Sequence, residues 1–491
     1  MSNSPSIHES LLTLSRQLMH CQLQIYRAEW DLEVDETADK AAALRHMVKQ
    51  QLTFHALCLQ PELAQLPADT GDTRIDELRR LHAQAKGIDL SLIETAAGAA
   101  LRSLQSWHAA VAANDYSLVR EPHENVIILQ RRMARIKADN LSALYGRAVT
   151  PYEALIDNYD PGRTLEFIKT TFDKVGQTCR TILDRKGVPT APPLFAHPVD
   201  TGKQAAFCLH VMTAMGYDAV PPRGVLGVSA HPLCRRVGPR EVWLTNRYSP
   251  NNFSHALMNI IHEGGHGRYY QNLPEVLADD WMGGVAGETI NEGMALFAEQ
   301  VIGRSREFCS WLAPQFEAQL GQAVTASTLH DHLTAVSRDD MVRAEAREVM
   351  YPLHLRLRIA VEEALINDGL KTADLPAFWN QQSKDLMGFT PPDDVTGCLQ
   401  DIHPFVGYIG YFPCYGLGFM VAAQIGAALK AAVPDVAAHW AKGDMTSTNH
   451  WLQAHIYKHG RMLPADKLIE VATGKPLGPD ALIAHLQERY G

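Results

Sequence analysis

The chain has 491 residues, of which 46% are hydrophobic and 20% are charged, and its formal net charge is −10 at pH 7. These values are typical of a folded protein of enzyme size and exclude a collagen-like, coiled-coil or intrinsically disordered chain. Because acidic side chains outnumber basic ones and no long Lys/Arg block occurs, we expect neither nucleic acid nor an anionic membrane as a partner.

Segment 1–20 has no basic region leading into an apolar core and no small-residue cleavage site, so it does not resemble a targeting signal. We identify no run of about 18 uncharged apolar residues and therefore expect a cytoplasmic protein that does not cross a membrane. The eight cysteines are scattered without Cys-x-x-Cys spacing, which indicates neither a thiolate metal site nor a disulfide framework.

Helical periodicity dominates the first part of the chain. From about residue 8 to residue 145, apolar residues recur three and four positions apart, as at Leu129, Met133 and Ile136, which predicts a helical lid or wall over 1–145. Prolines and glycines then predict loops at 160–162, 187–193 and 221–224.

One strand signal stands out, in the two short runs Val225 to Ser229 and Glu241 to Thr245, which predict a small β-hairpin. The second run is expected to be an edge strand that pairs with an extended peptide. Asn251 or Asn252 then caps a helix that reaches His266, and the chain from 284 onward is again helical. The predicted fold is mainly α, with a small sheet beside one helix.

Segment 262–266 has the sequence His-Glu-Gly-Gly-His, an H-E-x-x-H motif. On a helix, His262 and His266 lie one turn apart on the same face, so both imidazoles can reach one metal ion, and Glu263 leans toward the same side. A solvated helix face is the alternative. Gly264 and Gly265 argue against it, because a helix that carries two costly glycines usually has another segment close to its backbone.

A hydrolytic zinc ion needs a third protein ligand and leaves its fourth position to water. Glu288 and Glu292 are one helical turn apart, so spacing alone does not choose between them. The segment Asn-Glu-Gly at 291–293 resembles the Asn-Glu-Ala segment of thermolysin-like enzymes, which favours Glu292 and leaves Glu288 as the second choice. No third histidine follows His266 closely, so an all-histidine site is not indicated.

The chain also resembles the M32 metallocarboxypeptidases, the family of Taq carboxypeptidase. Apart from the motif, the resemblance is carried by collinear segments at Tyr152–Asp157, Asp160–Gly162, Ser229–Pro232, Thr245–Tyr248, Ile302–Ser305, Leu399–His403, Gly410–Pro413 and His459–Arg461. It implies a single peptidase unit over 1–491, with its catalytic part in 146–491. It also implies an elongated, mainly helical body with a deep groove, similar in outline to neurolysin and angiotensin-converting enzyme.

The resemblance has implications for the site and for activity. Alignment on Gly303 and Arg304 places the family's glutamate ligand on Glu292. The family also implies one zinc or cobalt ion per chain, a homodimer, and removal of single C-terminal residues from peptides with broad specificity. The chain departs from the family pattern at Asn291 and Gly293, at Arg347 and at Pro404, as a divergent member would.

Roles in hydrolysis follow from the chemistry and the resemblance. Glu263 is the expected base for the attacking water, and an oxyanion donor is expected among His403, Tyr411 and Tyr415. Simple helix packing is the alternative for the two tyrosines.

Carboxylate recognition suits an arginine, because its planar fork donates two parallel hydrogen bonds. The resemblance implies that Arg343 binds the substrate carboxylate. Alternatively, Arg343 forms an ion pair with a neighbouring carboxylate of the protein. His231 is a further candidate substrate contact or a structural loop residue. Two rival functions remain open: an oligopeptidase or aminopeptidase with the same metal centre, and a non-catalytic, metal-bearing peptide binder.

Overall fold

The structure is a computed structural model that describes residues 7–34, 37–68, 70–186, 194–195 and 197–491. The loop predicted at 187–193 lies outside these residues. The described chain is mostly helical and contains one small sheet, which confirms the mainly α fold. It divides into two compact units, each assembled from separate stretches of sequence. Unit 1 comprises Met1–Leu57, Ala191–Ala335 and Gly418–Leu477, and unit 2 comprises Cys58–Thr190, Val336–Leu417 and Gly478–Gly491.

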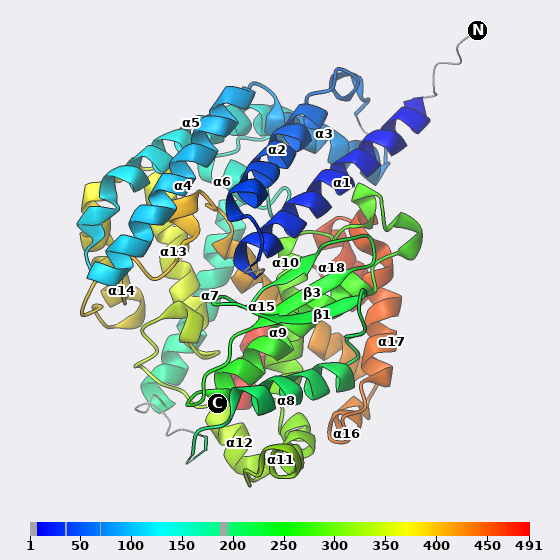
Figure 1. Ribbon diagram of the computed structural model, residues 1–491, viewed down its shortest axis with the longest axis vertical. Coiled ribbons are helices and arrows are strands. Elements are labelled where there is room, and N and C mark those ends of the chain that lie inside the picture. The colour runs from blue at the N-terminus through cyan, green and yellow to red at the C-terminus, as the bar shows by residue number, and fades with distance from the viewer. Residues whose placement is uncertain (1–6, 35–36, 69, 187–193, 196) are drawn as a thin grey trace. The chain divides into compact units, whose positions relative to one another are not determined.

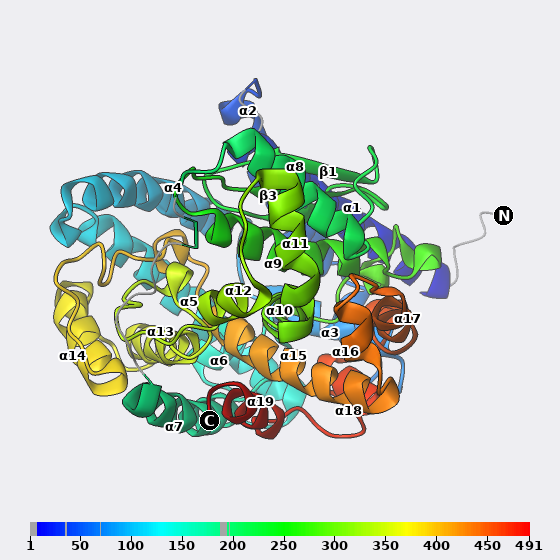
Figure 2. The ribbon, with the colours of Figure 1, turned by 90° about the horizontal axis from the view of Figure 1, so that it is seen from below.

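Unit 2 is helical. Its elements are η1 (Leu63–Gln65), α3 (Thr73–Ala85), α4 (Leu90–Ala113), η2 (Tyr116–Leu118), α5 (Arg120–Tyr145), α6 (Pro151–Ile156), α7 (Leu165–Lys186), η6 (Arg343–Glu345), α13 (Tyr351–Ile366), η7 (Thr372–Asp374), α14 (Leu375–Met387), η8 (His403–Val406) and α19 (Asp480–Tyr490). In the predicted apolar stripe of α5, Met133 is buried with Ile88 and Leu92, and Leu129 and Ile136 pack partly buried against this cluster. The C-terminal helix α19 lies alongside α7, as Figure 2 shows.

Unit 1 holds the H-E-x-x-H motif. Its elements are α1 (Ile7–Glu33), α2 (Lys40–Cys58), α8 (Thr201–Ala214), β1 (Gly224–Val228), β2 (Cys234–Arg236), β3 (Val242–Asn246), α9 (Phe253–Gln271), η3 (Glu275–Leu277), η4 (Trp281–Gly283), α10 (Glu288–Leu296), η5 (Phe297–Gly303), α11 (Arg306–Leu320), α12 (Ala326–Leu333), most of α15 (Phe412–Ala432), α16 (Val436–Trp440), α17 (Thr446–His455), η9 (Tyr457–Met462) and α18 (Ala465–Thr473).

The sheet has the strand order β1-β3-β2. Both predicted strands exist, but the predicted hairpin between them is wrong, because β1 and β3 are parallel. Parallel strands cannot be joined by a tight turn. The chain therefore leaves β1, forms β2, and turns back at 237–241 into β3, with which β2 is antiparallel. Since β3 is paired on both sides, the prediction that it is an edge strand is also wrong.

Helix α9 packs against this sheet, as the neighbouring green elements in Figure 1 show. Val242 and Leu244 of β3 are fully buried. The predicted cap is confirmed at Asn252, whose side chain accepts a hydrogen bond from the backbone of His255 at the start of α9. The sheet on one side and α10 on the other thus hold the motif helix in place.

Helix α15 corrects the expectation that no apolar run of membrane-spanning length occurs. Its mean hydropathy reaches 1.4 over an 18-residue window, so its length and composition would allow it to cross a membrane. However, 83% of that window is buried inside the protein. A core helix buried on all sides is apolar all round, and its composition needs no membrane.

Candidate metal centre

Two glycines allow the motif helix to approach its neighbouring helices closely. A β-carbon on Gly265 would lie 2.5 Å from the Ala295 Cα and 2.6 Å from the Met294 carbonyl oxygen of α10. A β-carbon on Gly264 would lie 2.3 Å from the end of the Met212 side chain. The close packing inferred from these glycines is therefore confirmed: Gly265 packs on α10, the helix that carries Glu292, and Gly264 packs on Met212 of α8.

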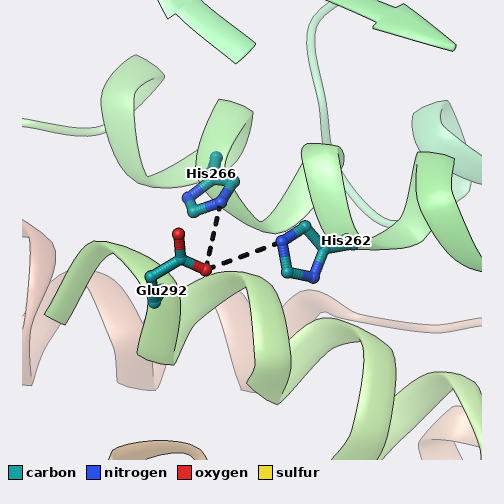
Figure 3. Close-up of side chains that lie close together, drawn as sticks. All are labelled: His262, His266 and Glu292. Carbon is teal, nitrogen blue, oxygen red and sulfur yellow. Dashed lines mark ion pairs between the residues drawn. The ribbon is translucent and has the colours of Figure 1, made fainter. Parts of the chain in front are cut away.

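The side chains of His262, His266 and Glu292 converge between α9 and α10 (Figure 3). Oε2 of Glu292 lies 3.7 Å from Nε2 of His262 and 3.7 Å from Nε2 of His266. One ligand atom from each residue lies within 4.8 Å of the others. Among the described residues, these three form the one such group of histidines, cysteines and carboxylates.

His262 is backed by a charged partner. Its Nδ1 lies 3.0 Å from Oε2 of Glu299, whose other oxygen accepts from Arg304 at 2.8 Å and from Gln300 at 2.7 Å. Glu299 lies in η5, a π-helical segment that follows α10 directly; such segments are frequent at functional sites. Burial lowers the pKa of His262, but the hydrogen bond and charge of Glu299 outweigh it and raise the pKa to about 9.

His266 is backed by a neutral partner. Its Nδ1 lies 3.0 Å from Oδ1 of Asn291, and Nδ2 of Asn291 donates to Glu288 at 2.9 Å and to the hydroxyl of Tyr270 at 3.2 Å. Burial, together with the charge of nearby His262, lowers the pKa of His266 to about 3. Glu288, the second choice for the third ligand, thus contacts Asn291 and lies outside the convergent group.

Glu263, the expected base, is a buried residue of α9 and follows His262 directly in the sequence. Burial raises the pKa of its carboxyl, and the positive charges of His262 and Arg235 oppose that shift. Arg235 comes from β2, a strand that was not predicted.

The donor set fits a divalent metal ion. Each histidine has its Nδ1 next to an oxygen of another side chain and its Nε2 facing the same oxygen of Glu292. Two imidazole nitrogens and one carboxylate form the ligand set of catalytic zinc sites that keep a fourth position for water.

The predicted carboxylate-binding residue, Arg343, lies in unit 2. Its Nε and one terminal nitrogen donate to Oδ1 of Asp401 at 2.8 and 2.7 Å, and its other terminal nitrogen donates to the Tyr351 hydroxyl at 3.0 Å. The second oxygen of Asp401 accepts from Arg358 at 2.6 Å. The two arginines hold the pKa of the Asp401 carboxyl well below its usual range, although its burial acts in the opposite direction.

The three candidate oxyanion donors also lie in unit 2, close to one another. The hydroxyl of Tyr415 lies 3.5 Å from Nε2 of His403, and the rings of Tyr411 and Tyr415 meet edge to face at 5.0 Å. The Tyr415 ring also lies under Arg343, 5.2 Å from its guanidinium carbon. His231 of unit 1, in contrast, is exposed in the loop after β1.

Besides Asn291, two departures from the family pattern have neighbours that the structure describes. A β-carbon on Gly293 would lie 2.4 Å from a methyl group of Val421, so α10 and α15 approach closely there. Arg347 forms an ion pair with Asp340 at 2.8 Å. The positive charge at 347 is thus paired within the same segment of unit 2.

A sequence profile of the carboxypeptidase Taq (M32) metallopeptidases matches residues 29–490. The chain belongs to the M32 family of metallocarboxypeptidases. It is 28% identical to thermostable carboxypeptidase 1 of Pyrococcus furiosus over 94% of each chain, and 27% identical to its namesake from Thermus thermophilus over 98% of each. Metallocarboxypeptidase 1 of Trypanosoma cruzi has a similar structure, with a TM-score of 0.89 and 28% identity over 99% of this chain and all of that one.

Membership in the M32 family implies a divalent metal ion. The sequence of this M32 member did not predict that Glu299 and Arg304 support His262. It also did not predict the contacts of Glu288 and Tyr270 with Asn291. Glu299 follows Glu292 by seven residues, which would be close to two turns of an α-helix, but position 299 lies in the π-helical segment η5, so this spacing does not predict its direction.

Proposed function

We propose that the chain is a zinc-dependent carboxypeptidase that removes single C-terminal residues from peptides with broad specificity, with cobalt as an alternative metal. The observation that supports this most directly is the convergence of His262, His266 and Glu292 around one point, with Glu263 on the same helix as the histidines. We propose these three side chains as the metal ligands and Glu263 as the base.

A bound divalent ion polarises the scissile carbonyl and favours ionisation of the attacking water. Glu263 takes the proton of that water and passes it to the leaving amine, a transfer for which a carboxylate sheltered from bulk solvent is suited. His403, Tyr411 and Tyr415 are the proposed donors to the oxygen that becomes negative in the transition state.

Arg343 is the proposed ligand for the free carboxylate of the substrate. Arg343 and Arg358 together bring two positive charges to the single carboxylate of Asp401, so one positive charge remains in excess within a shell of aromatic rings. The side chain of Arg343 is 11% exposed and that of Arg358 only 1%, so Arg343 is the one that a dissolved anion can reach. A substrate carboxylate would balance this charge.

Two sets of peptides test the proposal, each blocked at the N-terminus and ending in either a free carboxylate or an amide. The zinc- or cobalt-loaded protein is expected to shorten only the free acids, one residue at a time, and Glu263→Gln is expected to lose at least 100-fold in kcat. Cleavage of the amides as well would instead support an oligopeptidase, and metal binding without any cleavage would support a non-catalytic peptide binder.

Arg343→Met tests the carboxylate contact, and Arg347→Met in the same segment is the matched control, because Arg347 is paired with Asp340. The first variant is expected to raise KM for the free acids, while the second leaves it unchanged. By family resemblance we also propose a homodimer that acts in the cytoplasm on peptides, with neither nucleic acid nor membrane as a partner. Light scattering at micromolar concentration would contradict the dimer if it gave the mass of one chain.

A further inference from the structure

The two proposed histidine ligands are oriented by different means. Nδ1 of His262 faces an oxygen of Glu299. A carboxylate oxygen only accepts hydrogen bonds, so Nδ1 must carry the hydrogen and the lone pair of a neutral ring is left on Nε2. His266 faces Asn291, and an amide has both a donor end and an acceptor end. A second group must decide which end of Asn291 faces His266.

That group is Glu288. Nδ2 of Asn291 carries two hydrogens and has two acceptors within reach, the Glu288 carboxylate at 2.9 Å and the Tyr270 hydroxyl at 3.2 Å. If the amide were reversed, its oxygen would face the carboxylate oxygen of Glu288, and two acceptors would oppose each other. The carboxylate therefore fixes the amide, and the amide oxygen faces Nδ1 of His266.

We propose that Glu288 and Asn291 form a relay that positions His266: Glu288 orients the amide of Asn291, and Asn291 holds the imidazole tautomer that leaves Nε2 facing Glu292. The proposal rests on the metal centre proposed above and assigns two positioning residues to it. Neither residue contacts the reacting atoms.

The local fold favours this relay. Glu288 is the first residue of α10 and Asn291 lies one turn later, so the two side chains project from the same face of the helix. The next residue along is Glu292, so a single turn of α10 supplies both a ligand and the support for another ligand. Asn291 is 5% exposed, and water therefore competes weakly for its hydrogen bonds.

The simpler interpretation is that Glu288 only complements the positive end of the α10 dipole. Under that interpretation, loss of its charge would change the stability of the fold and would leave metal affinity unaltered. The relay instead predicts that metal affinity falls when it is broken, because groups that orient a metal-bound histidine typically contribute 10- to 100-fold to affinity.

The experiment measures Zn²⁺ affinity of the metal-stripped full chain by competition with a chromophoric chelator, and the visible absorption spectrum of the Co²⁺-loaded protein. Asn291→Leu removes the acceptor and is expected to weaken Zn²⁺ binding by roughly 10- to 100-fold and to alter the Co²⁺ bands. Asn291→Asp places two carboxylates side by side and is expected to weaken binding as well. Adding Glu288→Gln to Asn291→Asp restores a donor facing an acceptor, so the double variant is expected to regain most of the affinity.

Tyr270→Phe is the control, since it removes one acceptor of Asn291 and leaves Glu288 in place; its affinity is expected to stay within about twofold of the wild type. The relay is overturned if the double variant binds no more tightly than Asn291→Asp, or if Asn291→Leu folds and binds like the wild type. The metal centre itself fails in a distinguishable way, when His262→Ala binds Zn²⁺ as tightly as the unaltered chain.

Discussion

Gly265 of α9 lies against Ala295 of α10 so closely that a β-carbon at position 265 would be 2.5 Å from the Ala295 Cα. That contact sets the separation of the two helices that carry the histidines and Glu292. Backbone atoms cannot move aside as the end of a side chain can, so the glycine is a geometric requirement of the site.

Gly265→Ala is expected to destabilise the protein by about 1–3 kcal/mol and to weaken metal binding, because α10 must shift and take Glu292 with it. Gly264→Ala is the matched control. Its β-carbon would meet only the flexible end of Met212, and the gain in helix propensity of about 1 kcal/mol offsets the adjustment. Thermal unfolding and chelator competition on both variants check the prediction, which is wrong if the two behave alike.

Removing the carboxylate of Glu299, which faces Nδ1 of His262, is expected to weaken metal binding. Glu299→Leu removes the partner of Nδ1 and leaves Arg304 without its carboxylate, so we expect Zn²⁺ affinity to fall by roughly 10- to 100-fold. Glu317→Leu, on the exposed surface of α11, controls for the loss of one negative charge from unit 1. Equal affinities for the two variants would show that Glu299 does not support His262.

Sequence reasoning anticipated the parts of this protein that follow from local spacing. The pair His262 and His266, the Asn252 cap and the close contact at Gly265 all follow from the geometry of one helix. The sequence did not predict strand β2, because its three residues, Cys234–Arg236, are too few to show an alternating pattern.

Interactions that depend on tertiary structure were also missed. The register of β1 on β3 and the direction of Glu299, which lies on a π-helical segment, are set by packing between elements and leave little trace in periodicity. The ion pair of Asp401 with Arg358 joins residues 43 positions apart, a separation at which spacing predicts nothing.

Asp401→Asn is expected to destabilise unit 2 by about 3–5 kcal/mol, because it leaves two buried guanidinium groups without their shared carboxylate. Asp340→Asn is the control, since Asp340 pairs with the single, more exposed Arg347. Urea unfolding at pH 7 should show the larger loss for Asp401. Because Asp401 has a lowered pKa in the fold, its contribution is present above its unfolded pKa near 4 and disappears on further acidification.

The contribution of Glu362 to the stability of unit 2 is expected to depend on pH in the opposite direction to that of Asp401. Its Oε2 accepts from the Tyr152 hydroxyl at 2.7 Å and from the Gly410 backbone at 3.0 Å, yet burial raises its pKa to about 8. The folded state therefore favours the protonated acid. Its contribution to stability is complete below the unfolded pKa of 4.5 and is lost as the pH rises through about 8.

Glu362→Gln keeps the shape of the side chain and cannot ionise, so its unfolding free energy relative to the wild type is expected to increase steadily between pH 5 and pH 8. Comparing variant and wild type at each pH cancels the titration of all other groups. Glu363→Gln on the same helix loses only a more exposed ion pair with Lys169 and serves as the control. A difference between Glu362→Gln and the wild type that stays constant across this range would mean that Glu362 is ionised in the fold at neutral pH. The acid form is expected because burial opposes the carboxylate charge more strongly than the two hydrogen bonds to Oε2 favour it, and among the described residues no donor faces Oε1.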